Sequence, residues 1–196
     1  AMHPLLQRSQ YFIKEHVGVF KAANNFDIHD PETGEVLLHC REPNLGFFTK
    51  LLRFTDYKRM TPFEVVIGTP QGQALITVKR GISLFLSRVE VLDEQQRTIG
   101  SFKQKLFSIG GKFDVLDARD EVICTLQGQW TSWDFRFMKG QEELAQVNKQ
   151  WAGLAKELLT SADHYALRIN PALAPDDHAR QMILAAVMCI DMVLKE

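Results

Sequence analysis

The stretch that decides the fold is Asp176 to Glu196, which reads DDHARQMILAAVMCIDMVLKE. Twelve of the thirteen residues from Met182 to Leu194 are apolar, and no glycine or proline interrupts them. A helix on a protein surface shows a polar face at a period of 3.6 residues, whereas this run is apolar on every side apart from Asp191. The stretch therefore predicts a helix, over about residues 176–196, that is buried all round.

We expect this helix to lie in the core of a protein. A bilayer span needs ~20 predominantly apolar residues, and this run is shorter and carries an acid near its end. We expect Asp191 to lie at the rim of the core with a polar partner, although an acid in a membrane span would be functional by default. The residues expected to form the core of the helix are Ile183, Leu184, Val187 and Ile190.

Length and charge restrict the class of protein. A chain of 196 residues can form one domain that buries roughly 70% of its unfolded surface, and we expect a single domain over residues 1–196. The chain has 23 basic and 24 acidic residues, so no overall field attracts nucleic acid, and contact with a membrane must come from a local patch. Nucleic acid is not expected as a partner.

The cysteines indicate the compartment. Cys40, Cys124 and Cys189 are odd in number, lie far apart and have apolar neighbours in the sequence, which is typical of reduced core thiols. We therefore expect a cytoplasmic protein, with peripheral association with a membrane as an open alternative.

One short unit of strand, turn and returning strand recurs along the chain. Each copy alternates apolar and polar residues and is broken by Gly, Asp or Asn, which predicts a β-hairpin. The five copies are Phe26–Asp30 with Glu35–Cys40, Phe63–Ile67 with Gln73–Val78, Val89–Asp93 with Thr98–Phe102, Phe113–Asp117 with Glu121–Leu126, and Phe135–Met138 with Glu143–Val147.

Successive hairpins predict an antiparallel meander over about residues 10–170. An open sheet tends to curl or split beyond ~10 strands, and closure removes its exposed edges. A barrel that wide needs a filling, and the apolar helix supplies it. The expected fold is mainly β: a closed antiparallel barrel of about twelve strands around a buried C-terminal helix.

Three segments near the end of the chain resemble the C-terminal part of phospholipid scramblases: Val147–Gly153, Lys156–Leu167 and Ile183–Val193. The hairpin units, with Gly110–Asp117, are similar to the LURP-one-related family, which has the Tubby C-terminal-like fold. The resemblance covers roughly Gln10 to Glu196. It implies a twelve-stranded barrel around a hydrophobic helix and a phospholipid surface as the partner.

The resemblance also places a proposed calcium segment at residues 161–172. Calcium binds six to eight oxygens, mostly from carboxylates, and Asp163 is the one carboxylate in this segment. A plain turn before the helix is the favoured interpretation. We therefore expect no cofactor, with Asp163 as a weak calcium candidate.

The segment from Leu45 to Met60 departs from the hairpin rhythm. Its apolar residues can share one helical face while the others are basic, which is typical of a segment in a membrane interface. A short helix that plugs one end of the barrel has the same pattern, and both interpretations stay open. The lipid-contact candidates are Phe47, Phe48, Lys50, Leu51, Leu52, Arg53, Lys58 and Arg59.

Other basic residues on predicted strands are candidates for binding anionic lipid head groups, although an ordinary solvated face is the alternative. These candidates are Lys79, Arg80, Arg88, Lys103 and Lys105.

None of the common catalytic sequence motifs occurs, so we expect no enzyme. The leading hypothesis is a scramblase-related protein that binds anionic phospholipid surfaces and takes part in phospholipid movement or membrane-linked regulation. The alternative is a soluble scaffold or regulatory binding module, with an unidentified protein partner and no lipid activity.

Overall fold

The computed structural model describes residues 2–15, 25–42, 63–80, 88–104, 113–129, 134–149 and 164–193. The elements are η1 (Pro4–Leu6), β1 (Gln10–Glu15), β2 (Phe26–His29), β3 (Val36–Arg41), β4 (Phe63–Gly68), β5 (Ala74–Arg80), β6 (Arg88–Leu92), β7 (Thr98–Gln104), β8 (Phe113–Asp117), β9 (Val122–Gln129), β10 (Asp134–Lys139), β11 (Glu142–Asn148), β12 (His164–Ile169) and α2 (His178–Val193).

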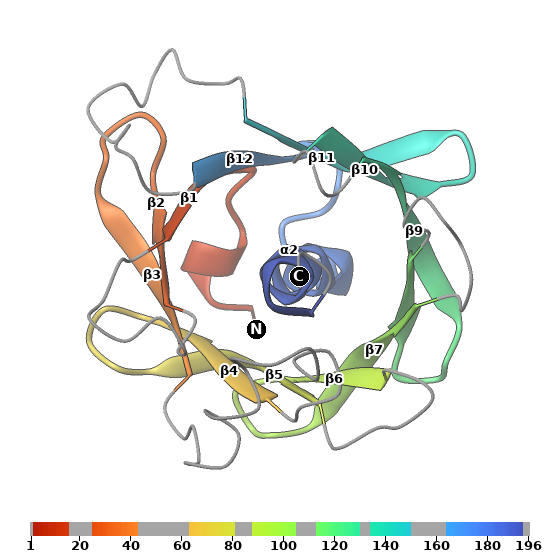
Figure 1. Cartoon of the computed structure of the whole chain (residues 1–196), viewed down its shortest axis with the longest axis horizontal. Coiled ribbons are helices and arrows are strands. Elements are labelled where there is room, and N and C mark those ends of the chain that lie inside the picture. Colours follow the sequence, from red (N-terminus) through yellow and green to blue (C-terminus); the bar gives the residue numbers. More distant parts are fainter. Residues whose placement is uncertain are drawn as a thin grey trace, which may run out of the picture.

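The twelve strands form one closed barrel around α2, as the view down the barrel in Figure 1 shows. Each strand pairs antiparallel with the next in sequence, and β1 closes the ring by pairing with β12. The ring therefore has no free edge. The fold predicted from the sequence is confirmed.

Helix α2 is the core of the barrel. Every residue from Met182 to Ile190 is at most 1% exposed, because the inward-facing side chains of the strands surround the helix. The predicted core positions Ile183, Leu184, Val187 and Ile190 are all in this run. The backbone of Asp191 belongs to α2, but its side chain lies outside the described part of the structure.

The helix begins at His178, two residues after the expected start. The helix begins there because the carboxylate of Asp177 accepts a hydrogen bond from the Ala179 N–H at 2.8 Å. A carboxylate in this position satisfies a backbone donor that has no partner within the helix. Asp177 is therefore the N-cap of α2.

All five hairpins carry a β-bulge at the same place, just after the turn. In each case the returning strand has one extra residue that has no register partner, and a bulge of this kind re-aims a side chain. The extra residue is always a leucine or an isoleucine, and it is buried in the core or packs against it. The five are Leu37, Leu75, Ile99, Ile123 and Leu144.

Each hairpin turn also contains one residue with a positive φ. Three turns use glycine, which adopts this conformation without steric cost. The other two use Gln96, with φ of 62°, and Asp120, with φ of 61°. These two turns therefore hold an ordinary residue in a conformation that favours glycine.

Replacing Gln96 by glycine is expected to raise the free energy of unfolding by about 0.5–1 kcal/mol, because the left-handed conformation costs other residues roughly 1–2 kcal/mol. Urea unfolding of the two proteins measures the difference. Gln95→Gly, one position earlier in the same turn, is the matched control and should give no gain. A loss of stability in Gln96→Gly would contradict the assigned turn.

Gly100 on β7 permits a close approach between the barrel wall and α2. A Cβ atom there would lie 2.4 Å from the Leu116 carbonyl oxygen and 2.5 Å from Cε of Met182. Contacts this short require the backbone of β8 to move. A glycine at this position is therefore a packing requirement.

Gly100→Ala is expected to lower the free energy of unfolding by about 1–3 kcal/mol, as overpacking a core typically does. Thermal and urea unfolding measure the loss. Gln95→Ala, in an exposed turn, should leave stability within about 0.5 kcal/mol of the wild type. Unchanged stability in Gly100→Ala would show that α2 does not press against β7 as described.

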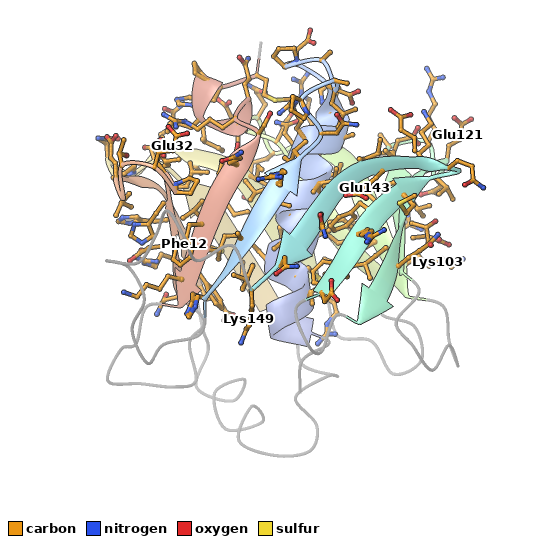
Figure 2. The ribbon with its side chains drawn as sticks, turned by 90° about the horizontal axis from the view of Figure 1, so that it is seen from above. Phe12, Glu32, Lys103, Glu121, Glu143 and Lys149 are labelled. Atoms are coloured by element: carbon orange, nitrogen blue, oxygen red, sulfur yellow. The ribbon has the colours of Figure 1, made fainter. Side chains whose placement is uncertain are left out.

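The barrel has two unlike ends. The five tight hairpin turns and the N-terminus of α2 lie at one end, here called the turn end. The side view in Figure 2 shows Glu32 and Glu121 at this end, with α2 running along the barrel axis and Lys149 toward the opposite end. That opposite end, where β1, β3, β5, β7, β9 and β11 finish, is called the connection end.

Candidate functional site

The turn end is closed by a clasp of hydrogen bonds around Arg180, on the first turn of α2. Arg180 is 3% exposed. Its Nη1 donates to the carbonyl of Arg8 at 2.9 Å and to that of Gln7 at 3.3 Å, while Nη2 donates to Leu173 at 2.8 Å and Nε to Ala174 at 3.0 Å. One guanidinium therefore joins the helix, the segment before it and the N-terminal segment.

The N-terminal segment itself packs into this end of the barrel. Leu6 of η1 is 2% exposed and belongs to the core, and the Tyr11 hydroxyl donates to the Leu5 carbonyl at 2.8 Å. Burial raises the pKa of Tyr11, against the opposing effect of the nearby Arg8 and Arg180 charges. Figure 1 shows η1 beside α2 inside the ring. The N-terminal segment thus packs inside the turn end of the barrel.

Arg180→Met is expected to lower the free energy of unfolding by at least about 3 kcal/mol, since it strands several buried carbonyls that now accept charge-assisted hydrogen bonds. Thermal unfolding measures the loss. Arg180→Lys should recover part of it, because one ammonium retains the charge and reaches fewer acceptors. Equal stability of Arg180→Met and wild type would mean that the clasp contributes nothing.

Two shallow clefts lie side by side at the turn end and share Asp93, Arg97 and His178. Their volumes are about 330 and 470 Å³. Burial acts to raise the pKa of Asp93, but hydrogen bonds from the backbone of Arg97 and Gln95, with the charge of Arg97, outweigh it and hold that pKa below its usual range. Asp93 is therefore an ionised residue that holds its own turn. Neither cleft is lined by a residue that the sequence analysis proposed for contact with lipid, a head group or a metal.

The basic candidates on the outer wall of the barrel are surrounded by acids. Lys79 on β5 is exposed and lies between Glu64 on β4 and Glu90 on β6, its register partners on either side. Side chains directly opposite one another on antiparallel strands face the same way and interact. A lipid head group at Lys79 would therefore also meet two carboxylates.

Arg80 is not on this outer face, so its interpretation as a head-group candidate is wrong. Arg80 is 4% exposed, and consecutive strand residues point to opposite faces, which places it on the inner side with Ile76 and Val78. Burial raises the pKa of the Cys189 thiol in α2 to about 12, and the positive charge of Arg80 opposes that rise. The Arg80 side chain thus lies inside the barrel.

Arg88 and Lys103 are the head-group candidates that the structure brings together, as register partners on β6 and β7. Both are exposed. Arg88 forms an ion pair with Asp120 at 2.5 Å, and Lys103 has Asp114 as its partner on the other side. Exposed pairs of this kind contribute little stability, so both cations remain accessible to an anion. The fifth candidate, Lys105, lies outside the described residues.

The predicted lipid-contact segment lies outside the described residues, between β3 and β4. The two strands pair with each other and meet this segment at the connection end. Asp163 also lies outside the described residues. Within the described ranges, no group of three or more His, Cys, Asp or Glu side chains gathers where it could hold a metal ion.

The sequence profile of the Scramblase family matches residues 5–196. The chain belongs to the Scramblase family. Membership of the Scramblase family indicates a phospholipid-related function and confirms the resemblance found in the sequence. Among solved structures, an X-ray structure of a protein from Arabidopsis thaliana is similar, with 16% identity, a TM-score of 0.55 and coverage of 93% of this chain and 90% of that one. That similarity supports the shared fold.

Proposed function

We propose that this Scramblase-family chain is a non-enzymatic protein that binds anionic phospholipid surfaces through the outside of its barrel. The family match over residues 5–196 carries the proposal. The lipid contacts proposed are Phe47, Phe48, Leu51 and Leu52 with the basic residues Lys50, Arg53, Lys58 and Arg59, and the head-group contacts are Lys79, Arg88, Lys103 and Lys105.

The filled interior supports an external binding surface. A helix whose large side chains from Met182 to Ile190 are almost fully enclosed leaves the barrel only at a cost of about 1.5–3 kcal/mol for each. The sum is comparable with the whole stability of a typical domain, about 5–15 kcal/mol. Among the described residues, no helix combines the length and the apolar character that crossing a bilayer requires. Peripheral association is therefore the mode of binding that we propose.

The proposed contacts differ in how well their surroundings suit an anionic surface. Lys79 has a glutamate on each side, whereas residues 47–59 contain four basic residues and one acid, Asp56. Basic residues near an anionic membrane each contribute about 1 kcal/mol. Residues 47–59 are therefore the main lipid contact in this proposal, and Lys79 is a minor one.

Co-sedimentation with vesicles tests the proposal. The protein is expected to bind vesicles that contain anionic phospholipid more strongly than neutral ones, and more weakly as salt is raised from 0.1 to 0.5 M, because salt screens the attraction. Adding calcium should change little, given the single carboxylate in residues 161–172. Failure to bind vesicles of either kind would overturn the proposal.

A pair of variants tests the ranking of the contacts. Lys50→Glu/Arg53→Glu is expected to weaken binding to anionic vesicles at least about tenfold, and Lys79→Glu, flanked by Glu64 and Glu90, much less. Circular dichroism and thermal unfolding confirm that each variant is folded. If Lys79→Glu weakened binding more than Lys50→Glu/Arg53→Glu, the main lipid contact would be assigned to the part of the barrel wall formed by β4, β5 and β6. A leaflet-exchange assay then tests the finer proposal that the protein moves phospholipid between leaflets.

A soluble scaffold or regulatory module is the second candidate function. The mixed charge of the outer wall around Lys79 and the two clefts at the turn end favour it, because both are surfaces that suit a polar partner. Absence of vesicle binding, together with a normally folded protein, would support this alternative.

A further inference from the structure

The two clefts at the turn end together carry an excess of negative charge. Their lining residues include five carboxylates and two guanidinium groups. Arg97 is already paired, since its Nε donates to the Asp93 carboxylate at 3.3 Å, and Arg119 lines only the larger cleft. The other acids are Glu94 and Asp176 in the cleft of about 330 Å³, and Asp117 and Glu121 in the cleft of about 470 Å³. Both volumes are in the range of ligand pockets, about 300–1,000 Å³.

Most of these acids keep oxygens that a ligand can reach. Among the residues that the structure describes, the Asp176 and Glu121 side chains form no hydrogen bond or ion pair, and both are exposed. Asp117 uses only Oδ1, which accepts from the N–H groups of Arg119 and Glu121 at 2.8 and 3.0 Å. Glu94 has one long contact, 3.4 Å from its Oε2 to Nε2 of Gln73. A cation in either cleft would therefore meet carboxylates that the chain has not already paired.

A buried amide narrows the kind of ligand. Gln181, near the start of α2, lines the smaller cleft and is only 6% exposed. Its Oε1 lies 3.0 Å from Nδ1 of His178, while its Nε2 has no acceptor within the described part of the chain. Nε2 is not fully enclosed, so the cleft gives access to it. A buried donor without an acceptor is costly, and a ligand that places an oxygen there would remove that cost.

Both clefts also have apolar surface beside their acids. Met2 lines the smaller cleft, Ile99 and Ile123 line the larger one, and all three pack against the core. Lysine and arginine lay their aliphatic stems along such surfaces while their charged heads reach polar groups. A small polyamine has the charge but offers no acceptor oxygen to Gln181. A basic peptide offers the cations, the aliphatic stems and the carbonyl oxygen.

We propose that the two clefts form a docking site for an extended basic segment of a partner protein. One basic side chain meets Glu94 and Asp176, the other meets Asp117 and Glu121, and a backbone carbonyl of the segment accepts from Gln181. The clefts lie side by side, and side chains two positions apart share one face of an extended chain. The segment therefore carries two basic residues separated by one other. This inference goes beyond the proposed lipid binding and does not depend on it.

NMR titration of the full ¹⁵N-labelled chain locates the site. The probe is a short capped peptide in which two arginines are separated by one serine. It is expected to shift the amide signals of residues 93–98, 117–121 and 176–181, and to leave those of residues 32–34 and 140–142, in other turns of the same end, unchanged. Glutamine in place of both arginines should weaken binding at least about tenfold. Shifts confined to another surface, or no binding up to about 1 mM peptide, would overturn the site.

Matched variants separate the clefts from overall charge. Glu94→Gln/Asp176→Asn is expected to weaken binding of the arginine peptide about three- to tenfold. The control Glu32→Gln/Glu142→Gln removes the same charge from the turn end outside the clefts, where Figure 2 shows Glu32 across the barrel from Glu121. It should change binding less than about twofold. Thermal unfolding checks that both variants are folded, and an equal loss in both would overturn the site.

The amide contact distinguishes a peptide from a small polyamine. Gln181→Met keeps a side chain of similar length without the amide, and is expected to weaken peptide binding at least about threefold. Spermidine, which has no carbonyl oxygen, is expected to bind more weakly than the peptide and equally to both proteins. Spermidine binding as tightly as the peptide would overturn the peptide as the occupant. Vesicle binding is measured separately, so its absence would overturn the proposed function and leave this site intact.

Discussion

The burial of α2 along the barrel axis is the constraint on which the rest of this structure depends. A ring of twelve strands is too wide for its own inward side chains to fill, so a stable barrel of this size needs a separate occupant. The helix meets that need with a run of apolar residues on all of its faces. The wall must also come close to the helix, as Gly100 does at Met182. The hydrogen bonds of Arg180 fix the position of the helix along the barrel axis and its direction.

The same constraint explains where function can reside. With the interior filled, any lipid or protein partner meets the outer wall or one of the ends. The wall mixes both signs of charge, with Lys79 between two glutamates. At the turn end, carboxylates such as those of Asp93 and Asp117 accept hydrogen bonds that hold the hairpin turns in shape.

The sequence was informative about the fold because the signals for it are local. The apolar run of α2 and the recurring hairpin unit are each visible within some twenty residues, and together they predicted a filled barrel. The five bulges were not predicted, although a leucine or isoleucine recurs at the same place in every unit. The clasp could not be predicted, because Arg180 and its acceptor Gln7 are 173 residues apart. Arg80 was misplaced because Lys79 and Arg80 were taken as one basic pair, although neighbours on a strand face opposite ways.

The position of α2 in the chain also sets the order in which the molecule can be completed. The helix is synthesised after all twelve strands, and β1 must wait for β12 before the ring can close. Until α2 has been made, the inner faces of the twelve strands have no helix to cover, and exposed apolar surface with unpaired strand edges favours aggregation. Long-range closure of this kind also slows folding. The growing chain therefore exposes the inner face of its strands until α2 has been made.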